Sequence, residues 1–193
     1  MEIVDRSGAK APVAVVGRGG TLTARLLRGL QPWPVVELTP CQAAMADGQY
    51  RAVVVENFEP HAPDVLSACA AARWGLSRRA EVTVVGMDDP EGRRFAAAGG
   101  GTVYAYSDGR PQADLTAKNV RLRGGRLEFE ALTDSELLRV RVPIGREPRL
   151  YDHLAALAGA LALGVPLAEA AARLNGSAKP RVTNRRSVTM QKR

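Results

Sequence analysis

The chain has 193 residues, of which 46% are hydrophobic, so it can form one α/β domain with a sizeable core. No stretch approaches the roughly 18 apolar residues of a membrane span, and Met1 to Lys10 lack the apolar run of a signal peptide, which predicts a cytoplasmic protein. The net charge is +7, and Cys41 and Cys69 have no CxxC spacing and no nearby histidines, so we expect reduced core thiols rather than metal ligands or a disulfide.

Up to Pro111, apolar and β-branched runs alternate with helical segments. This alternation is typical of a parallel sheet that helices cover on both faces. The predicted strands are residues 12–16, 35–38, 52–56, 82–86 and 102–106. The predicted helices between them are residues 21–30, 63–76 and 91–98.

A different pattern follows Pro111. From about 112 to 142 the residues alternate between apolar and polar with a period of two and turn at Gly124-Gly125, which predicts an antiparallel hairpin or three-strand meander. Two helices are expected next, over 150–164 and 166–176. The predicted fold class is therefore α/β, a mostly parallel, doubly wound sheet with an antiparallel appendage and two C-terminal helices.

The basic residues gather at the C-terminal end. After Gly176 the segment SAKPRVTNRRSVTMQKR holds six Lys or Arg and no Asp or Glu, so subtracting its charge from +7 leaves residues 1–176 at about +1. We expect a folded domain over 1–176 and a flexible basic tail over 177–193. Two interpretations of the tail stay open: a solvated disordered end, or an arm that contacts an anionic partner such as nucleic acid.

Four stretches, taken in order, resemble one known family. The glycine loop VAVVGRGGTLTARLL (13–27) is similar to a strand, loop and helix that reads roughly V-T-G-T-N-G-K-T-T-T, and YRAVVVE (50–56) to a strand that ends in a metal-associated glutamate. VTVVGMDDPEGRRFA (82–96) resembles a strand followed by N-x-D-D-P, and residues 142–174 resemble a segment with a glycine, spaced asparagines and L-A-A. Together they resemble the central, ATP-binding domain of the Mur ligases, which include the peptidoglycan amino-acid ligases, folylpolyglutamate synthase and cyanophycin synthetase.

The resemblance implies a nucleotide site for ATP or ADP with Mg. Its residues would be Gly17, Arg18, Gly19, Gly20, Thr21, Thr23 and, near the adenine, Asp152. In the family a lysine follows the last glycine and neutralises the β- and γ-phosphates, and the next residue offers magnesium a hydroxyl. Here these places hold Thr21 and Leu22, so we expect a backbone cradle that still approaches an anion but transfers no phosphoryl group. Arg18 either reaches a phosphate from another direction or is an exposed surface arginine.

Glu56 is the acidic residue that the resemblance assigns to magnesium. Asp88 and Asp89 could suggest a metal pair, but a turn before Pro90 explains them without an ion. His61 does not match the family spacing, and residues 63–76 carry an alanine where the family has a lysine that is carbamylated in some members. We therefore expect the second magnesium site to be missing.

Asp152 has two interpretations: it accepts a hydrogen bond from an adenine amine, or together with His153 it decorates the exposed face of an apolar helix. The flanking N- and C-terminal domains of full ligases of the family also do not fit into this chain, which predicts a stand-alone domain.

The sequence therefore predicts a catalytically degenerate, Mur ligase-like binding or scaffold protein without catalytic residues, with weak nucleotide affinity, linked to cell-wall or related peptide metabolism. A protein partner or a second copy is expected, and part of residues 153–174 could form the interface unless core packing buries it. One alternative is an ATP-dependent amide ligase or ATPase that works with a partner subunit. Another is a carrier whose basic tail binds an anionic partner.

Overall fold

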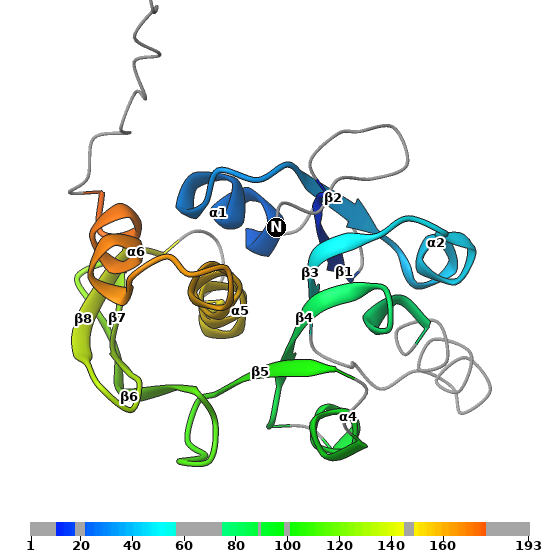
Figure 1. The fold of residues 1–193 in the computed structure, drawn as a ribbon. Helices are drawn as coiled ribbons and strands as arrows, with labels where there is room; N and C mark the ends of the chain where they lie inside the picture. The colour runs from blue at the N-terminus through cyan, green and yellow to red at the C-terminus, as the bar shows by residue number, and fades with distance from the viewer. Residues whose placement is uncertain are drawn as a thin grey trace, which may run out of the picture.

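An eight-stranded sheet organises the described part of the chain, in the order β2-β1-β3-β4-β5-β6-β7-β8 (Figure 1). The computed structural model describes residues 11–17, 22–56, 75–88, 90–98, 101–144 and 149–176. The strands are β1 (Val13–Val16), β2 (Val35–Leu38), β3 (Tyr50–Val55), β4 (Ala80–Gly86), β5 (Thr102–Ser107), β6 (Leu115–Arg123), β7 (Arg126–Leu132) and β8 (Leu137–Pro143). The helices are α1 (Leu22–Leu30), α2 (Pro40–Met45), α4 (Pro90–Ala98), α5 (Leu150–Ala162) and α6 (Leu167–Leu174).

The predicted fold class is confirmed. β1 pairs in parallel with both β2 and β3, and parallel pairing continues through β4 and β5. β6 pairs in parallel with β5 over two residues and antiparallel with β7, and β8 completes the predicted meander. Of the predicted helix over 63–76, only the last two residues lie within the described part of the chain, and both are helical.

Helices cover both faces of the sheet because the central strands are apolar on both sides. On one face Val13, Val15 and Val54 pack with α1, α5 and α6. On the other face Val16 and Val55 belong to a separate core with Ala43 of α2 and Phe95 of α4. The valine-rich strands therefore divide the protein into two apolar layers, as a doubly wound sheet requires.

Helix α5 lies at the centre of the larger layer. The far strands of the sheet curl around it, so that β3 and β4 lie on one side of α5 and the meander on the other (Figure 1). A β-carbon on Gly159 would lie 3.0 Å from Val54 Cγ2 and 3.1 Å from Leu27 Cδ1, so the absence of a side chain there lets α5 approach both β3 and α1. Residues 153–160 of α5 are all buried, so core packing accounts for this part of the apolar stretch 153–174.

The meander turns where the paired glycines predicted it. Gly124 and Gly125 have φ angles of +55° and +70°, the left-handed region that a tight two-residue hairpin turn needs and that glycine enters without strain. Within β6 the register shifts between Lys118 and Arg121, where Asn119 has a φ of +53°. This bulge rotates the end of β6 relative to β7.

Helix α2 was not predicted, although the sequence carries its signal. Thr39 caps the helix by accepting a hydrogen bond from the Gln42 backbone N–H at 3.3 Å, and the Gln42 side chain accepts one from the Thr39 N–H at 2.8 Å. This reciprocal arrangement is a capping box, and Pro40 occupies the first helical turn. Cys41 on this helix is a free, exposed thiol, so its prediction as a core thiol is wrong, because the helix is short and buries only Ala43. Cys69 lies outside the described residues.

Polar side chains at the end of α6 form hydrogen bonds with the end of α1 and with β8. Arg173 donates to the carbonyl oxygens of Gly29 and Leu30 at the end of α1, at 3.3 and 3.1 Å. Asn175 accepts from the backbone N–H of Arg141 at 2.6 Å and donates to the carbonyl oxygen of Arg139 at 3.2 Å. Its amide therefore pairs with edge strand β8 much as another peptide group would. No helix in the described ranges is long and apolar enough to cross a membrane.

Candidate functional site

The first candidate site lies where the strand order reverses. β1 and β3 are neighbours, but the chain leaves β1 toward β2 on one side and leaves β3 toward β4 on the other. In open α/β sheets, ligands bind in the crevice at the carboxyl ends of the strands at such a switch point. Gly17 directly follows β1 and Glu56 directly follows β3, so the structure brings these two predicted site residues together.

Backbone hydrogen bonds fix both residues at this edge. The N–H of Gly17 donates to Leu38 at 3.1 Å, and the N–H of Glu56 donates to Val16 at 3.0 Å. A β-carbon on Gly17 would lie 1.9 Å from Oε2 of Glu56 and 2.7 Å from its carboxyl carbon. The Glu56 carboxylate thus occupies the space next to the first residue of the glycine loop, where its negative charge disfavours a second anion and favours a cation.

The other predicted loop residues have mixed outcomes. Arg18, Gly19, Gly20 and Thr21 lie outside the described residues. Thr23 lies in the first turn of α1 and is completely buried, and its hydroxyl has no hydrogen-bond partner in the described part of the chain. The structure therefore places Thr23 in the core of the domain.

Asp152 and His153 lie in the first turn of α5 but differ in their surroundings. Asp152 is half-buried and forms an ion pair with Arg149 at 3.4 Å. His153 is only 6% exposed, so the expectation that it decorates an exposed face is wrong, because α5 is enclosed by the sheet, α1 and α6. Its Nδ1 lies 2.7 Å from the carbonyl oxygen of Arg149, and burial lowers the pKa of its ring, while that carbonyl and Asp152 act in the opposite direction.

Asp88 is the centre of a hydrogen-bond network after β4. It accepts from the Ser107 hydroxyl at 2.5 Å and from the Asp108 backbone N–H at 3.1 Å. The Ser107 oxygen in turn accepts from the backbone N–H groups of Gly109 and Arg110, at 3.1 and 2.9 Å. These contacts support the predicted turn as the role of Asp88, and they identify Ser107 as a structural partner that the sequence analysis missed. Asp89 lies outside the described residues.

Tyr151 connects this network to α5. Burial raises the pKa of its phenol most strongly, and hydrogen bonds with Asp108 and Asp88 together with their charges raise the pKa further. Tyr151, in the first turn of α5, is therefore close to the carboxylates of Asp88 and Asp108, which follow β4 and β5.

The described residues do not complete a magnesium site. No group of three or more His, Cys, Asp or Glu within the described ranges could hold a metal ion. Leu22, at the place where the family offers a hydroxyl, is the first residue of α1 and carries no ligand atom. Among the described residues, Glu56 is the carboxylate at the switch point, whereas Mg²⁺ in nucleotide sites is held by carboxylates, a hydroxyl, phosphates and water together.

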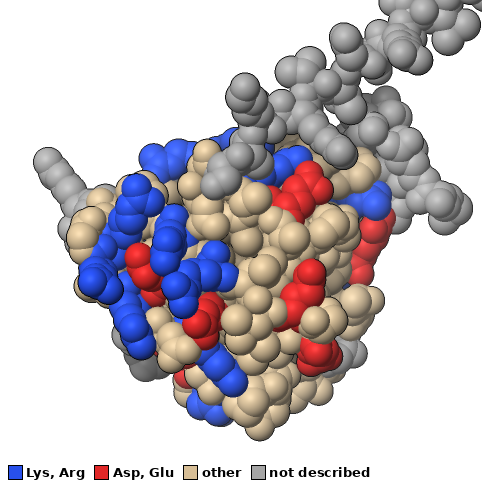
Figure 2. Space-filling model, turned by 90° about the vertical axis from the view of Figure 1, so that its left-hand side faces the viewer, with Lys and Arg blue, Asp and Glu red and all other residues tan. Residues whose placement is uncertain are grey.

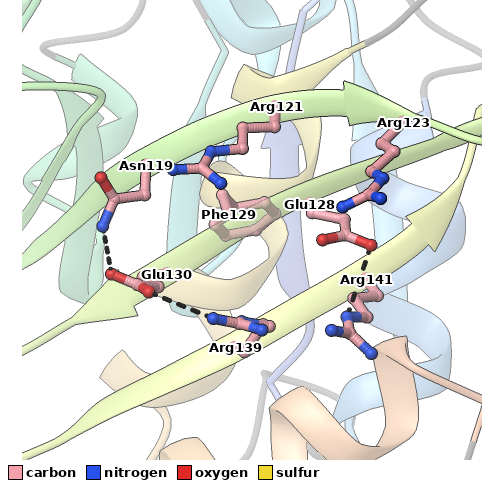
Figure 3. Close-up of a pocket in the computed structure, with 8 residues that line it drawn as sticks. All are labelled: Asn119, Arg121, Arg123, Glu128, Phe129, Glu130, Arg139 and Arg141. Carbon is pink, nitrogen blue, oxygen red and sulfur yellow. Dashed lines mark hydrogen bonds and ion pairs between the residues drawn. The ribbon is translucent and has the colours of Figure 1, made fainter.

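A second, separate hollow lies on the meander (Figure 3). It has a volume of about 270 Å³ and is lined by Asn119, Arg121, Arg123, Glu128, Phe129, Glu130, Arg139 and Arg141. This hollow was not predicted, although the repeated pattern of like charges two residues apart in three consecutive strands was a signal. Side chains two apart in a strand lie on the same face.

Comparison with known proteins identifies the fold. No protein-family model matches the sequence, and no curated protein matches it either. Among solved structures, the chain is similar to the UDP-N-acetylmuramoylalanyl-D-glutamyl-2,6-diaminopimelate–D-alanyl-D-alanyl ligase of Acinetobacter baumannii, with 19% identity and a TM-score of 0.69 over 86% of this chain and 45% of that one. It is also similar to a pseudomurein peptide ligase type C from Methanothermus fervidus, with 16% identity and a TM-score of 0.68 over 88% of this chain and 50% of that one.

A third similar structure is the MurF ligase of Thermotoga maritima in complex with ADP, with 13% identity and a TM-score of 0.61 over 83% of this chain and 48% of that one. The chain thus has the fold of the Mur ligases and spans about half the length of these solved structures. The fold that the sequence motifs predicted is confirmed.

Proposed function

We propose that this Mur ligase-like chain is a catalytically degenerate binding or scaffold protein of cell-wall or related peptide metabolism, which acts in the cytoplasm and holds nucleotide only weakly. The observation that carries the proposal is the contact between Glu56 and Gly17. A carboxylate that fills the space beside the first glycine of the loop repels the phosphates that such a loop would hold.

The residues around that contact support the same proposal. Phosphoryl transfer depends on cations that neutralise the developing charge on the transferred group. In this sequence Thr21 stands where the family has its lysine, and Leu22 where it has a hydroxyl for magnesium. With these groups replaced, binding rather than turnover is the function that the switch point supports.

A partner or second copy is part of the proposal. Helix α5 has little exposed surface that such a partner could contact, because His153 to Ala160 are buried inside the domain. A partner would therefore contact the outer side of the sheet or its covering helices.

One observation favours an alternative, an ATP-dependent amide ligase or ATPase that works with a partner subunit. Glu56 lies at the switch point, next to β1, where the resemblance assigns the metal-associated glutamate. In that alternative the partner would supply the missing cation and Glu56 would be required for turnover.

The test is the response of Glu56→Gln to nucleotide. We propose to measure binding of ADP without magnesium and of Mg-ATP by calorimetry and thermal shift, together with ATP hydrolysis. If Glu56 repels phosphate, its neutral variant binds ADP about fivefold or more tightly than the natural protein, as expected for losing one unit of repulsion at close range. If Glu56 holds magnesium, the variant binds Mg-ATP more weakly and loses any hydrolysis.

Glu136→Gln is the matched control, because Glu136 is exposed and lies in the turn between β7 and β8. A ligand at about 100 times its dissociation constant stabilises a fold by about 2.7 kcal/mol, which a melting curve detects readily. ATP hydrolysis that depends on Glu56 in the isolated chain would contradict the proposal. The absence of any thermal shift with millimolar nucleotide, in both the natural protein and Glu56→Gln, would remove the nucleotide part and leave the scaffold role.

A further inference from the structure

The outer face of the meander concentrates positive charge. Six basic side chains lie on β6, β7 and β8, and we call this surface the arginine face. Its members are Lys118, Arg121, Arg123, Arg126, Arg139 and Arg141, and all six are exposed. Figure 2 shows this basic cluster with a few acidic side chains among it. The only acidic residues on the outer side of the three strands are Glu128 and Glu130, so this face carries a net charge of about +4.

The strand register explains how the charges are arranged. Glu128 of β7 is opposite Arg121 of β6 and Arg141 of β8. Glu130 is opposite Lys118 and Arg139 in the same way. The row of two carboxylates therefore runs between two rows of cations.

The two rows of arginines are held differently. Arg141 lies 3.5 Å from Glu128 and Arg139 lies 3.6 Å from Glu130, so the β8 row is oriented by the carboxylates (Figure 3). Arg121 and Arg123 form no ion pair within the described part of the chain. The guanidinium N–H groups of the β6 arginines are thus not held by a carboxylate of the described residues, and those of β8 keep the N–H groups that the carboxylates do not use.

These side chains surround the hollow of about 270 Å³ described above (Figure 3). Two strand spacings separate β6 from β8, which places the two arginine rows about 10 Å apart. Consecutive outward side chains on each strand are about 7 Å apart. A ligand that spans the hollow would therefore meet guanidinium groups on both sides and along its length, with the carboxylates of Glu128 and Glu130 between the two rows.

The chain continues from α6 at the edge of the same face. Asn175 is hydrogen-bonded to the backbone of Arg139 and Arg141, so Gly176 lies beside β8. The residues after Gly176 contribute six further Lys or Arg and no acid. The basic segment after Gly176 therefore begins beside the strand that carries Arg139 and Arg141.

We propose that the arginine face binds the phosphodiester backbone of nucleic acid. Five of its six cations are arginines, whose planar guanidinium groups donate pairs of hydrogen bonds to phosphate oxygens. Phe129 is the one aromatic residue of β6, β7 and β8, and it is only 1% exposed, so the face has no exposed ring on which bases could stack. Binding is therefore electrostatic, independent of base sequence and separate from the switch point at β1 and β3.

The experiment uses the full chain and a fluorescently labelled duplex DNA of about 20 base pairs, with single-stranded RNA of similar length as a second probe. Anisotropy titrations at several salt concentrations should give a dissociation constant that is independent of sequence and weakens steeply with salt. Arg121→Gln with Arg123→Gln should weaken binding about tenfold or more and reduce the slope of log K against log salt by about two. A difference between the two probes would tell which nucleic acid is preferred.

The matched control is Arg78→Gln with Arg94→Gln. These two arginines are exposed and lie away from the meander, just before β4 and on α4, and the change removes the same formal charge. The control should bind like the natural protein, and melting temperatures should show that all variants are folded. Removing residues 177–193 should weaken binding but leave the effect of the Arg121 and Arg123 substitutions in place.

Several results would overturn the proposal. The first is no binding of either nucleic acid even at low salt. The second is equal loss of affinity in the test and control variants, which would show a dependence on net charge alone. The third is unchanged binding by the Arg121 and Arg123 variant. The fourth is equally tight, arginine-dependent binding to vesicles of phosphatidylserine and phosphatidylcholine or to polyglutamate, which would identify a general polyanion surface.

Discussion

The carboxylate of Glu56 lies against Gly17, so that a β-carbon on the glycine would approach Oε2 to 1.9 Å. Gly17→Ala must therefore displace the Glu56 side chain or the adjoining ends of β1 and β3. We expect a loss of about 1–3 kcal/mol in the free energy of unfolding, the usual cost of forcing an extra carbon into a packed site. Urea denaturation measures it.

A second substitution tests whether the clash with Glu56 causes the loss of stability in Gly17→Ala. Glu56→Ala removes the clashing atoms, so Gly17→Ala together with Glu56→Ala should regain most of the lost stability, and a double-mutant cycle should show strong coupling. Gly29→Ala is the control, because a β-carbon there has no neighbour within 4 Å and helix α1 gains from alanine. Additive effects of the two substitutions would contradict the contact.

A second prediction concerns the buried hydroxyl of Thr23. Because it has no hydrogen-bond partner in the described part of the chain, Thr23→Val should raise the free energy of unfolding by about 1 kcal/mol. Thr116 is the matched control, since it is also buried but donates to the carbonyl oxygen of Arg110 at 3.0 Å. Thr116→Val should lower stability by about 1 kcal/mol. If Thr23→Val instead destabilises the protein or abolishes nucleotide binding, Thr23 has a role beyond the core.

The sequence predicted most of the fold because its patterns are local. Valine-rich runs such as Val13–Val16 are apolar on both faces, which marks a central parallel strand, and the paired glycines at 124 and 125 require a tight turn. Helix α2 was not predicted because it is short and only Ala43 is buried, so it lacks the periodic apolar face on which helix prediction depends. Its capping residues were the only sign of it.

The candidate site was predicted less completely, because contacts between strands do not follow from spacing along the chain. The family resemblance assigned Gly17 and Glu56 to one nucleotide and magnesium site, but it did not predict that the carboxylate fills the space beside the glycine. The burial of His153 depends on how the sheet curls around α5. The arginine face requires the register of three strands, in which Glu128 and Glu130 separate the basic rows.

A third prediction is a pH dependence of stability that arises from His153. Burial lowers the pKa of this ring in the folded protein below the ordinary value of 6.5. As the pH falls below about 6.5, the unfolded chain takes up a proton that the folded chain does not, so the free energy of unfolding decreases. The stabilising contribution is fully present above pH 6.5 and is lost as the pH falls toward the lower pKa of the folded state.

The measurement is urea denaturation between pH 7.5 and about 5, above the range in which ordinary carboxylates titrate. His153→Asn retains an N–H group that can donate to the carbonyl of Arg149, and it should flatten the profile in this range. The chain contains one other histidine, so His61→Asn serves as the control and should leave the slope in place. A slope that persists in His153→Asn and disappears in His61→Asn would reverse the assignment.

A fourth prediction concerns Asn175, which satisfies the outer edge of β8 with both ends of its amide. Asn175→Ala removes the acceptor of the Arg141 N–H and the donor to the Arg139 carbonyl, so hydrogen exchange at the Arg141 amide should accelerate and stability should fall by about 1–2 kcal/mol. Asn175→Asp retains an acceptor for Arg141 but offers Arg139 no donor. It should therefore preserve slow exchange at the Arg141 amide and still lose stability.

Because an unpaired edge strand is a template for other strands, Asn175→Ala should also self-associate more readily at high concentration, which sedimentation measures. Unchanged exchange at Arg141 in both variants would show that the amide does not protect this edge, and that α6 is held to β8 by its apolar contacts alone.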